Sequence, residues 1–212
     1  MRRVLAVALL LFLLPGLALA HEQTDLDAND SEGPLDTVAA RLWDRGFCTV
    51  TVSHGEPQRA RCYTEIQLKL VTYDPWSSEV LSGPNDFISF EFDLDPDDAA
   101  DRCVVIRTPA QPDEPADATP ARPQATVYRG CTYTAADVFV RDIGRVRRPD
   151  DHSVRVLLRK NRLLPKGTGS FRWRSVTSYE RQGDQACGSQ GPPTEGGYGA
   201  CADYTAWRRH RG

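Results

Sequence analysis

Basic side chains are concentrated in the second half of the chain. Residues 138–181 contain twelve Lys or Arg against four Asp or Glu, although the formal net charge of the whole chain is −3. Arg172 and Arg174 flank Trp173, so on a strand they share the face opposite the Trp side chain. With Arg155 and Arg159 they predict a surface for an anionic ligand, such as an anionic or carbohydrate envelope polymer. The alternative is a solvated sheet face that balances acidic residues elsewhere.

Acidic side chains crowd one predicted strand end, at Asp93, Asp95, Asp97, Asp98 and Asp101. Carboxylate oxygens are the ligands that Ca²⁺ prefers. The spacing departs from an EF-hand loop, because Asp98 stands where that loop has its Gly and Val104 where it has its bidentate Glu. A solvated acidic turn and a calcium site both remain open, and no metal ligand is assigned.

The sequence contains only isolated candidates for catalytic residues, and none of them forms a complete motif. Glu65, Asp86 and Glu91 could be glycosidase carboxylates, but a sequence cannot show whether they converge. After cleavage at Ala20, His21 would begin the mature chain and could chelate copper with His54 or His152. Gly188-Ser189-Gln190-Gly191 is one residue short of a nucleophile elbow. We therefore assign no catalytic residue and expect no cofactor.

The first twenty residues have the build of a secretory signal peptide. Basic Arg2 and Arg3 precede an apolar run, and the segment ends on the small residues Ala18-Leu19-Ala20. We expect secretion to the extracellular space, with no membrane span after signal cleavage. Nucleic acid is not expected as a partner of an exported chain with a negative net charge.

The six cysteines all follow the signal segment, and an even number in an exported chain predicts three disulfides. Each sequential pair brackets or joins neighbouring predicted strands. We therefore favour these pairs over the fourteen other possible pairings. They are Cys48 with Cys62, Cys103 with Cys131, and Cys187 with Cys201.

Alternating apolar and polar residues predict short strands along most of the chain. Examples are 66–70, 87–92, 104–106, 126–128, 138–140, 154–158 and 171–176, and Leu42–Phe47 is interpreted as a strand end, a turn and the start of another strand. At least eight strands without a helical apolar period predict an all-β fold, a single antiparallel β-sandwich stapled by disulfides. We assign 1–20 to the signal peptide, 21–34 to an acidic mobile leader and 35–212 to the sandwich. Four tryptophans are candidates for its core: Trp43, Trp76, Trp173 and Trp207.

The order of several segments resembles a family of secreted actinobacterial β-sandwich proteins of unassigned function. The segments that carry the resemblance are Tyr73–Trp76, Phe90–Asp95, the strand of Cys103, Ser153–Val156, Asn161–Leu164 and Phe171–Arg174. The resemblance covers roughly residues 35–208 and implies a fold similar to carbohydrate-binding and DOMON-type sandwiches. It implies no catalytic residue.

These patterns favour a secreted, non-catalytic β-sandwich that binds a ligand or partner at the cell surface or in the extracellular medium, through its arginine-rich half. One alternative is a secreted enzyme, either a polysaccharide hydrolase or a copper oxygenase. It requires converging carboxylates, or His21 held beside a second His. The other alternative is a structural envelope component, which would have neither a binding patch nor a cleft.

Overall fold

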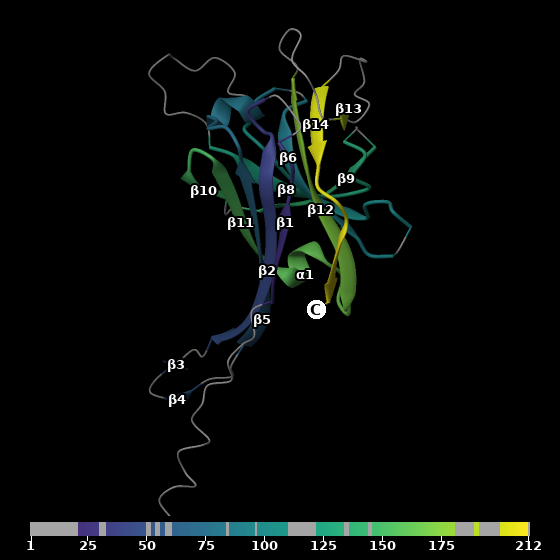
Figure 1. The fold of residues 1–212 in the computed structure, drawn as a ribbon. Coiled ribbons are helices and arrows are strands. Elements are labelled where there is room, and N and C mark those ends of the chain that lie inside the picture. Colours follow the sequence, from purple (N-terminus) through teal and green to yellow (C-terminus); the bar gives the residue numbers. More distant parts are fainter. Residues whose placement is uncertain are drawn as a thin grey trace, which may run out of the picture.

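The fold is a sandwich of two antiparallel sheets, as the strand pattern predicted (Figure 1). The computed structural model describes residues 21–29, 33–49, 52–53, 56–57, 61–83, 85–95, 97–109, 122–133, 136–143, 146–180, 189–190 and 200–211. The predicted signal peptide, residues 1–20, and most of the segments 109–123 and 187–201 lie outside this part of the chain. Within it, no helix is long and apolar enough to cross a membrane.

The smaller sheet has five strands in the order β1-β2-β5-β11-β10. Their bounds are β1 His21–Leu26, β2 Thr37–Thr49, β5 Arg61–Thr72, β11 Ser153–Arg159 and β10 Val146–Asp150. The two-residue strands β3 (Val52–Ser53) and β4 (Glu56–Pro57) lie between β2 and β5 in the sequence. A short helix, α1 (Lys160–Leu163), follows β11 directly.

The larger sheet has the order β13-β14-β12-β6-β7-β8-β9, and β15 pairs with β12 beside β14. Their bounds are β13 Ser189–Gln190, β14 Ala200–Tyr204, β12 Ser170–Glu180, β6 Phe87–Asp93, β7 Arg102–Arg107, β8 Gln124–Arg129, β9 Val138–Ile143 and β15 Arg208–Arg211. A 3₁₀ turn, η1 (Ser78–Leu81), precedes β6.

The main core lies between the two sheets and follows from the alternation. On β5, Ile66, Leu68 and Leu70 are buried, and they belong to one cluster with Phe90 and Trp173 of the larger sheet. Burying each large apolar side chain of this kind contributes about 1.5–3 kcal/mol. The residues between them on each strand point to the outer faces of the two sheets.

A second, smaller core covers part of the outer face of the larger sheet. Phe87, Val105 and Val176 are buried there beside the Cys103–Cys131 disulfide. Residues 130–133 turn back over the sheet, and Gly130, Cys131 and Tyr133 all have positive φ values. This cover explains why β6 is buried on both faces.

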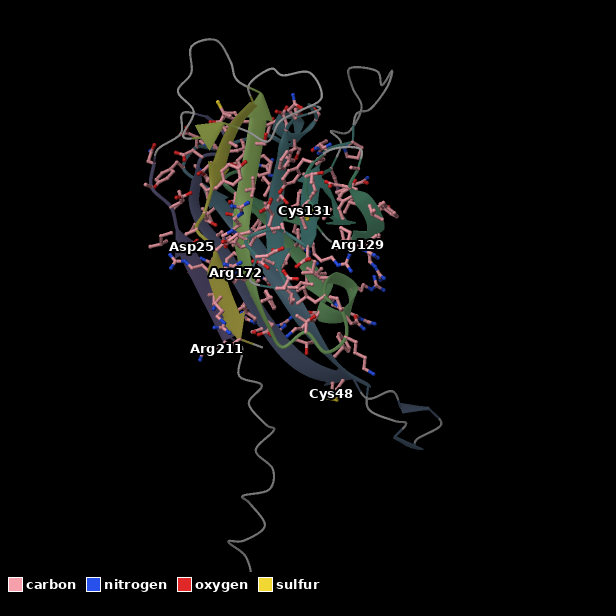
Figure 2. The ribbon with its side chains drawn as sticks, turned by 90° about the vertical axis from the view of Figure 1, so that its right-hand side faces the viewer. Asp25, Cys48, Arg129, Cys131, Arg172 and Arg211 are labelled. Atoms are coloured by element: carbon pink, nitrogen blue, oxygen red, sulfur yellow. A yellow bond between two sulfur atoms is a disulfide. The ribbon has the colours of Figure 1, made fainter. Side chains whose placement is uncertain are left out.

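Two of the predicted disulfides are confirmed. Cys48–Cys62 joins residues that are directly opposite on β2 and β5, and Cys103–Cys131 ties β7 to the segment after β8. Figure 2 labels Cys48 at the lower end of the smaller sheet. Cys201 is disulfide-bonded too. Cys187 lies outside the described residues, so its pairing stays a prediction.

The acidic leader expected over 21–34 is in part a strand, which corrects that expectation. β1 pairs with β2 along its whole length, from His21 opposite Asp44 to Leu26 opposite Ala39. Asp25 is buried and accepts a hydrogen bond from Arg208 Nε at 2.7 Å. Gln23 accepts a hydrogen bond from Trp173 Nε1 at 2.8 Å. These partners belong to β15 and β12, which are far away in the sequence. The residues 21–34 alone therefore give no indication of them.

Two further expectations need correction. The turn expected within Leu42–Phe47 does not exist, because β2 runs unbroken through these residues and pairs with β5 throughout. Trp76 and Trp173 are buried, but Trp43 and Trp207 are only half-buried and lie outside the core cluster. Trp43 alternates with the buried Leu42 and therefore takes the outer face.

Candidate functional site

A row of four basic side chains crosses the outer face of the smaller sheet. Arg41 on β2 is directly opposite Lys69 on β5, Lys69 is opposite Arg155 on β11, and Arg155 is opposite Arg147 on β10. Their neighbours Leu42, Leu68, Val154 and Val156 are buried in the core. We call Arg41, Lys69, Arg155 and Arg147 the cation row.

The cation row is only partly neutralised, although the positive charge of Lys69 also acts on Asp150 at the end of β10. Arg41 lies 3.8 Å from Glu22, and both side chains are about half exposed. Among the described residues, neither Lys69 nor Arg155 nor Arg147 has a carboxylate within the 4.0 Å that defines an ion pair. Neighbouring strands are about 4.8 Å apart, so the four charges extend over roughly 14 Å. Like charges directly opposite each other destabilise a sheet.

An aromatic and apolar row runs beside the cation row. Trp43, Gln67 and Leu157 are opposite one another on β2, β5 and β11, and each is half-buried. Trp43 thus presents part of its ring next to the charges. The basic face, by which we mean the outer face of the smaller sheet, therefore combines cations with a surface on which a flat ligand ring can pack.

The cation row continues into a cavity at the β10 edge of the sheet. This cavity of about 480 Å³ is lined in part by Arg122, Arg147, Arg148 and Arg155. The Arg148 guanidinium lies 3.9 Å from the ring centre of Trp76 and donates to the carbonyl of Asp151 at 3.0 Å. Burial lowers the pKa of Arg148. These contacts fix Arg148, whereas Arg147 is exposed.

The four arginines predicted to bind an anion lie in two pairs on opposite sheets. Arg155 belongs to the cation row, and Arg159 lies on the same outer face at the end of β11. Arg172 and Arg174 lie on β12, on the outer face of the larger sheet, and Trp173 faces the core as predicted. The two pairs cannot contact one ligand across the sandwich.

Arg172 and Arg174 are also neutralised by carboxylates, of which those of Asp93 and Glu91 are buried. Arg172 forms ion pairs with Asp93 and with Asp98, and Arg174 Nε lies 2.7 Å from Glu91. The indole of Trp207 covers both guanidiniums, at 5.7 and 4.5 Å from its ring centre. Figure 2 shows Arg172 beside the C-terminal strands. This pair stabilises the larger sheet and offers little charge to a ligand.

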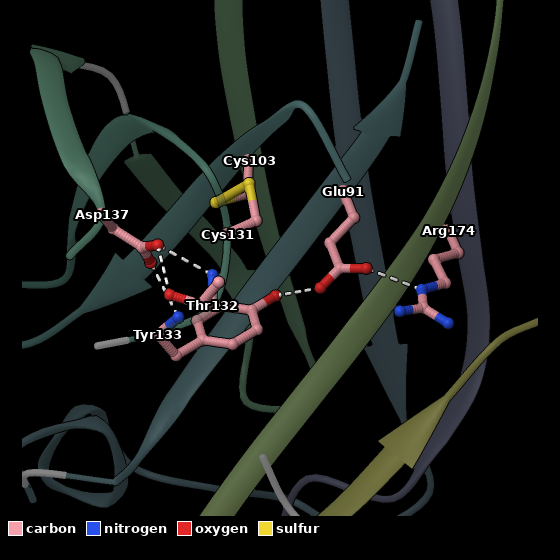
Figure 3. The surroundings of a disulfide bond; sticks show 7 residues. All are labelled: Glu91, Cys103, Cys131, Thr132, Tyr133, Asp137 and Arg174. Carbon is pink, nitrogen blue, oxygen red and sulfur yellow. Dashed lines mark hydrogen bonds and ion pairs between the residues drawn. A yellow bond between two sulfur atoms is a disulfide. The ribbon is translucent and has the colours of Figure 1, made fainter. Parts of the chain in front are cut away.

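Glu91 is the centre of a buried polar chain on the larger sheet (Figure 3). The Tyr133 hydroxyl donates to Glu91 at 2.5 Å, while Arg174 lies on the other carboxylate oxygen. The Tyr133 ring stacks on Phe87 with centroids 4.4 Å apart. Burial, and then the charge of Glu91, raises the pKa of Tyr133 well above its usual value. The adjacent Cys103–Cys131 bridge holds Tyr133 in place.

The acidic cluster occupies the loop after β6. Carboxylate oxygens of Asp93, Asp95 and Asp101 lie within 4.8 Å of one another. The charge of Asp97 is the largest cause of a raised pKa at Asp95. Asp101 accepts the backbone N–H of Leu94 at 2.7 Å, an ordinary role for an acid in a turn. Arg172 already lies against Asp93.

The three acids that could be glycosidase carboxylates do not come together. Glu65 lies on the outer face of the smaller sheet and Glu91 on that of the larger sheet, with the core between them. Asp86 precedes β6 and is buried. His152 lies in the turn before β11, 3.7 Å from Asp151. The His21 side chain and the whole of His54 lie outside the described part of the structure.

Sequence reasoning missed the cation row itself. Arg41 and Lys69 lie outside the basic stretch 138–181, and only the strand register brings them beside Arg155 and Arg147. The alternation around Lys69 already indicated that it faces solvent, but the pairing of β5 with β11 across about 85 positions carries no local signal. No protein-family model, curated protein or solved structure matches the chain.

Proposed function

We propose that this is an exported, non-catalytic binding protein whose basic face holds an extended anionic polymer of the cell surface or surrounding medium. The cation row supports this proposal most directly. Four cations stand on four consecutive strands at a regular interval, and three of them have no ion-pair partner among the described residues. A linear polyanion laid across the strands would meet one cation about every 4.8 Å.

The cations of the cation row repel one another, and a bound anion would remove this repulsion. Opposed like charges weaken the pairing of β2, β5, β11 and β10, whereas an anion between them converts repulsion into attraction. The neighbouring Trp43 and Leu157 favour a polymer made of rings, such as a polyuronate, because ring faces pack on aromatic and apolar surface. We therefore place a uronic acid polymer first among the candidate ligands.

Export is supported by the sequence and by the disulfides together. Disulfides persist in oxidising compartments, and two bridges join residues of the described fold. Residues 1–20 have the basic start, apolar run and small-residue end that are typical of a secretory signal peptide.

The test measures binding of the disulfide-bonded protein to immobilised polygalacturonate by biolayer interferometry at low salt. The double variant Lys69→Gln/Arg155→Gln removes the two central charges of the cation row. Two exposed ion contacts of about 1 kcal/mol each predict a 10- to 30-fold weaker Kd. Lys166→Gln/Arg129→Gln is the matched control, because both residues are exposed and neither belongs to the basic face.

Binding that weakens equally in both double variants would point to net charge alone and contradict the proposed site. Neutral dextran should not bind the unsubstituted protein. Binding should also weaken as salt rises, because exposed charges are screened beyond about 8 Å at physiological ionic strength.

A further inference from the structure

A cavity of about 350 Å³ opens beside the basic face, where β11 ends. It is lined by Tyr63, Glu65, Ile143, Leu157, Leu158, Arg159 and Arg162. Its size is near the lower end of small-molecule sites, so it suits one sugar ring better than a larger ligand. Among the described residues, the lining combines two cations, one acid, one aromatic ring and an apolar floor.

Arg159 is held by an aromatic ring and has no ion-pair partner among the described residues. It is directly opposite Glu65 in the register of β11 and β5, yet the two form no ion pair. Its guanidinium carbon lies 4.4 Å from the ring centre of Tyr63 instead. Stacking on an aromatic ring orients the guanidinium plane and leaves its N–H groups free for a carboxylate.

The second cation is presented by α1. This turn begins at the residue after Arg159, and it is anchored by buried Leu163 and by a 2.8 Å hydrogen bond from Leu164 N to Lys160 O. Arg162 is exposed and lines the cavity. Among the described residues it has no ion pair either, so the cavity holds two available guanidiniums.

Glu65 adds the feature that selects among anions. Its side chain is only 11% exposed, and its single ion-pair partner among the described residues is Arg45 at 3.5 Å. A carboxylate in the lining repels a doubly charged ion, such as inorganic sulfate, more strongly than a singly charged carboxylate, and it accepts hydrogen bonds from hydroxyl groups. A neutral sugar, in turn, would leave both arginines unused.

We propose that this cavity binds a single uronic acid residue, a singly charged carboxylate on a hydroxylated ring. Arg159 and Arg162 bind the carboxylate, Tyr63 and Leu157 pack against the ring, and Glu65 accepts from ring hydroxyls. The inference rests on the proposed function in one respect, since it takes the residue to be the end of a polymer on the basic face. Arg155 and Arg159 stand on the same face of β11, two positions either side of Leu157.

The test uses isothermal titration calorimetry of the whole disulfide-bonded protein with D-galacturonate and its trisaccharide. Arg159→Gln and Arg162→Gln should each weaken trisaccharide binding about tenfold, the loss of one charge-assisted hydrogen bond. Glucose, which lacks the carboxylate, should not bind measurably. Inorganic sulfate should compete poorly. Trisaccharide binding that is unchanged in both variants, or sulfate that competes as well as galacturonate, would overturn the assignment.

The two proposals fail separately. If Lys69→Gln/Arg155→Gln loses polymer binding but retains the trisaccharide, the cavity and the cation row are distinct contacts as proposed. If the trisaccharide does not bind while the polymer does, the cavity assignment is wrong and the basic face stands. Far-UV circular dichroism confirms that each variant is folded before its binding is compared.

Discussion

Replacement of Lys69 by Gln should make the free protein more stable, because Lys69 lies between two guanidiniums. Arg41 and Arg155 are its direct cross-strand neighbours. Each cross-strand pair of charges on a sheet surface changes the free energy of unfolding by about 0.2–1 kcal/mol. Removing two repulsions therefore predicts a gain of about 0.5–1 kcal/mol in the free energy of unfolding. For a domain of this size, that is a rise in Tm of about 1–4 °C.

Lys69→Glu should stabilise further, since each repulsion then becomes an attraction. The assay is thermal unfolding followed by circular dichroism at low and at high salt, with Lys166→Gln as the control. The gain should shrink at 1 M salt, where the Debye length falls to about 3 Å. A Lys69→Gln variant that is no more stable than the original at low salt would show that the row does not repel itself. A ligand would then have no electrostatic repulsion to relieve in the cation row.

Three further predictions concern the larger sheet and the disulfides. Arg174→Ala leaves the buried carboxylate of Glu91 without its ion-pair partner and should cost about 3 kcal/mol by urea unfolding, less if Glu91→Gln is added. The pKa of Tyr133 is raised in the folded protein, because the buried hydroxyl is favoured in its protonated form. The stability that this hydroxyl contributes is therefore fully present below about pH 10, and it is lost as pH rises through the pKa of the folded state. Tyr133→Phe should therefore flatten the alkaline decline, measured by chemical unfolding against pH. Cys48→Ser/Cys62→Ser opens a bridge with a sequence separation of 14 and should lower the free energy of unfolding by about 3 kcal/mol.

The class of fold could be predicted because alternation is a local signal. Ile66, Leu68 and Leu70 alternate with polar residues, and all three are in the core. The face assignments of Arg172 and Arg174 followed from the same period of two. Their neutralisation did not, because Asp93 and Glu91 approach them from a strand about 80 positions away.

The proposed binding face was harder to predict for the same reason. Composition identified residues 138–181 as basic, but it could not separate arginines paired with buried acids from arginines that have no ion-pair partner among the described residues. Strand register decides that question, and a slip of one residue would reverse the face of every side chain. The strand at 21–26 was missed because its polar sequence gains its partners only from β2, β12 and β15.

The link between Asp25 and Arg208 also bears on the order of folding. The two residues are separated by 183 positions, and Gln23 is joined to β12 and β15 across similar distances in the sequence. Contacts between such distant residues slow folding, because most of the chain must be ordered before they can form. Before residues 208–211 are available, β1 would bury the carboxylate of Asp25 without its cation. A chain that emerges N-terminus first therefore cannot complete this sandwich until nearly all of it is present.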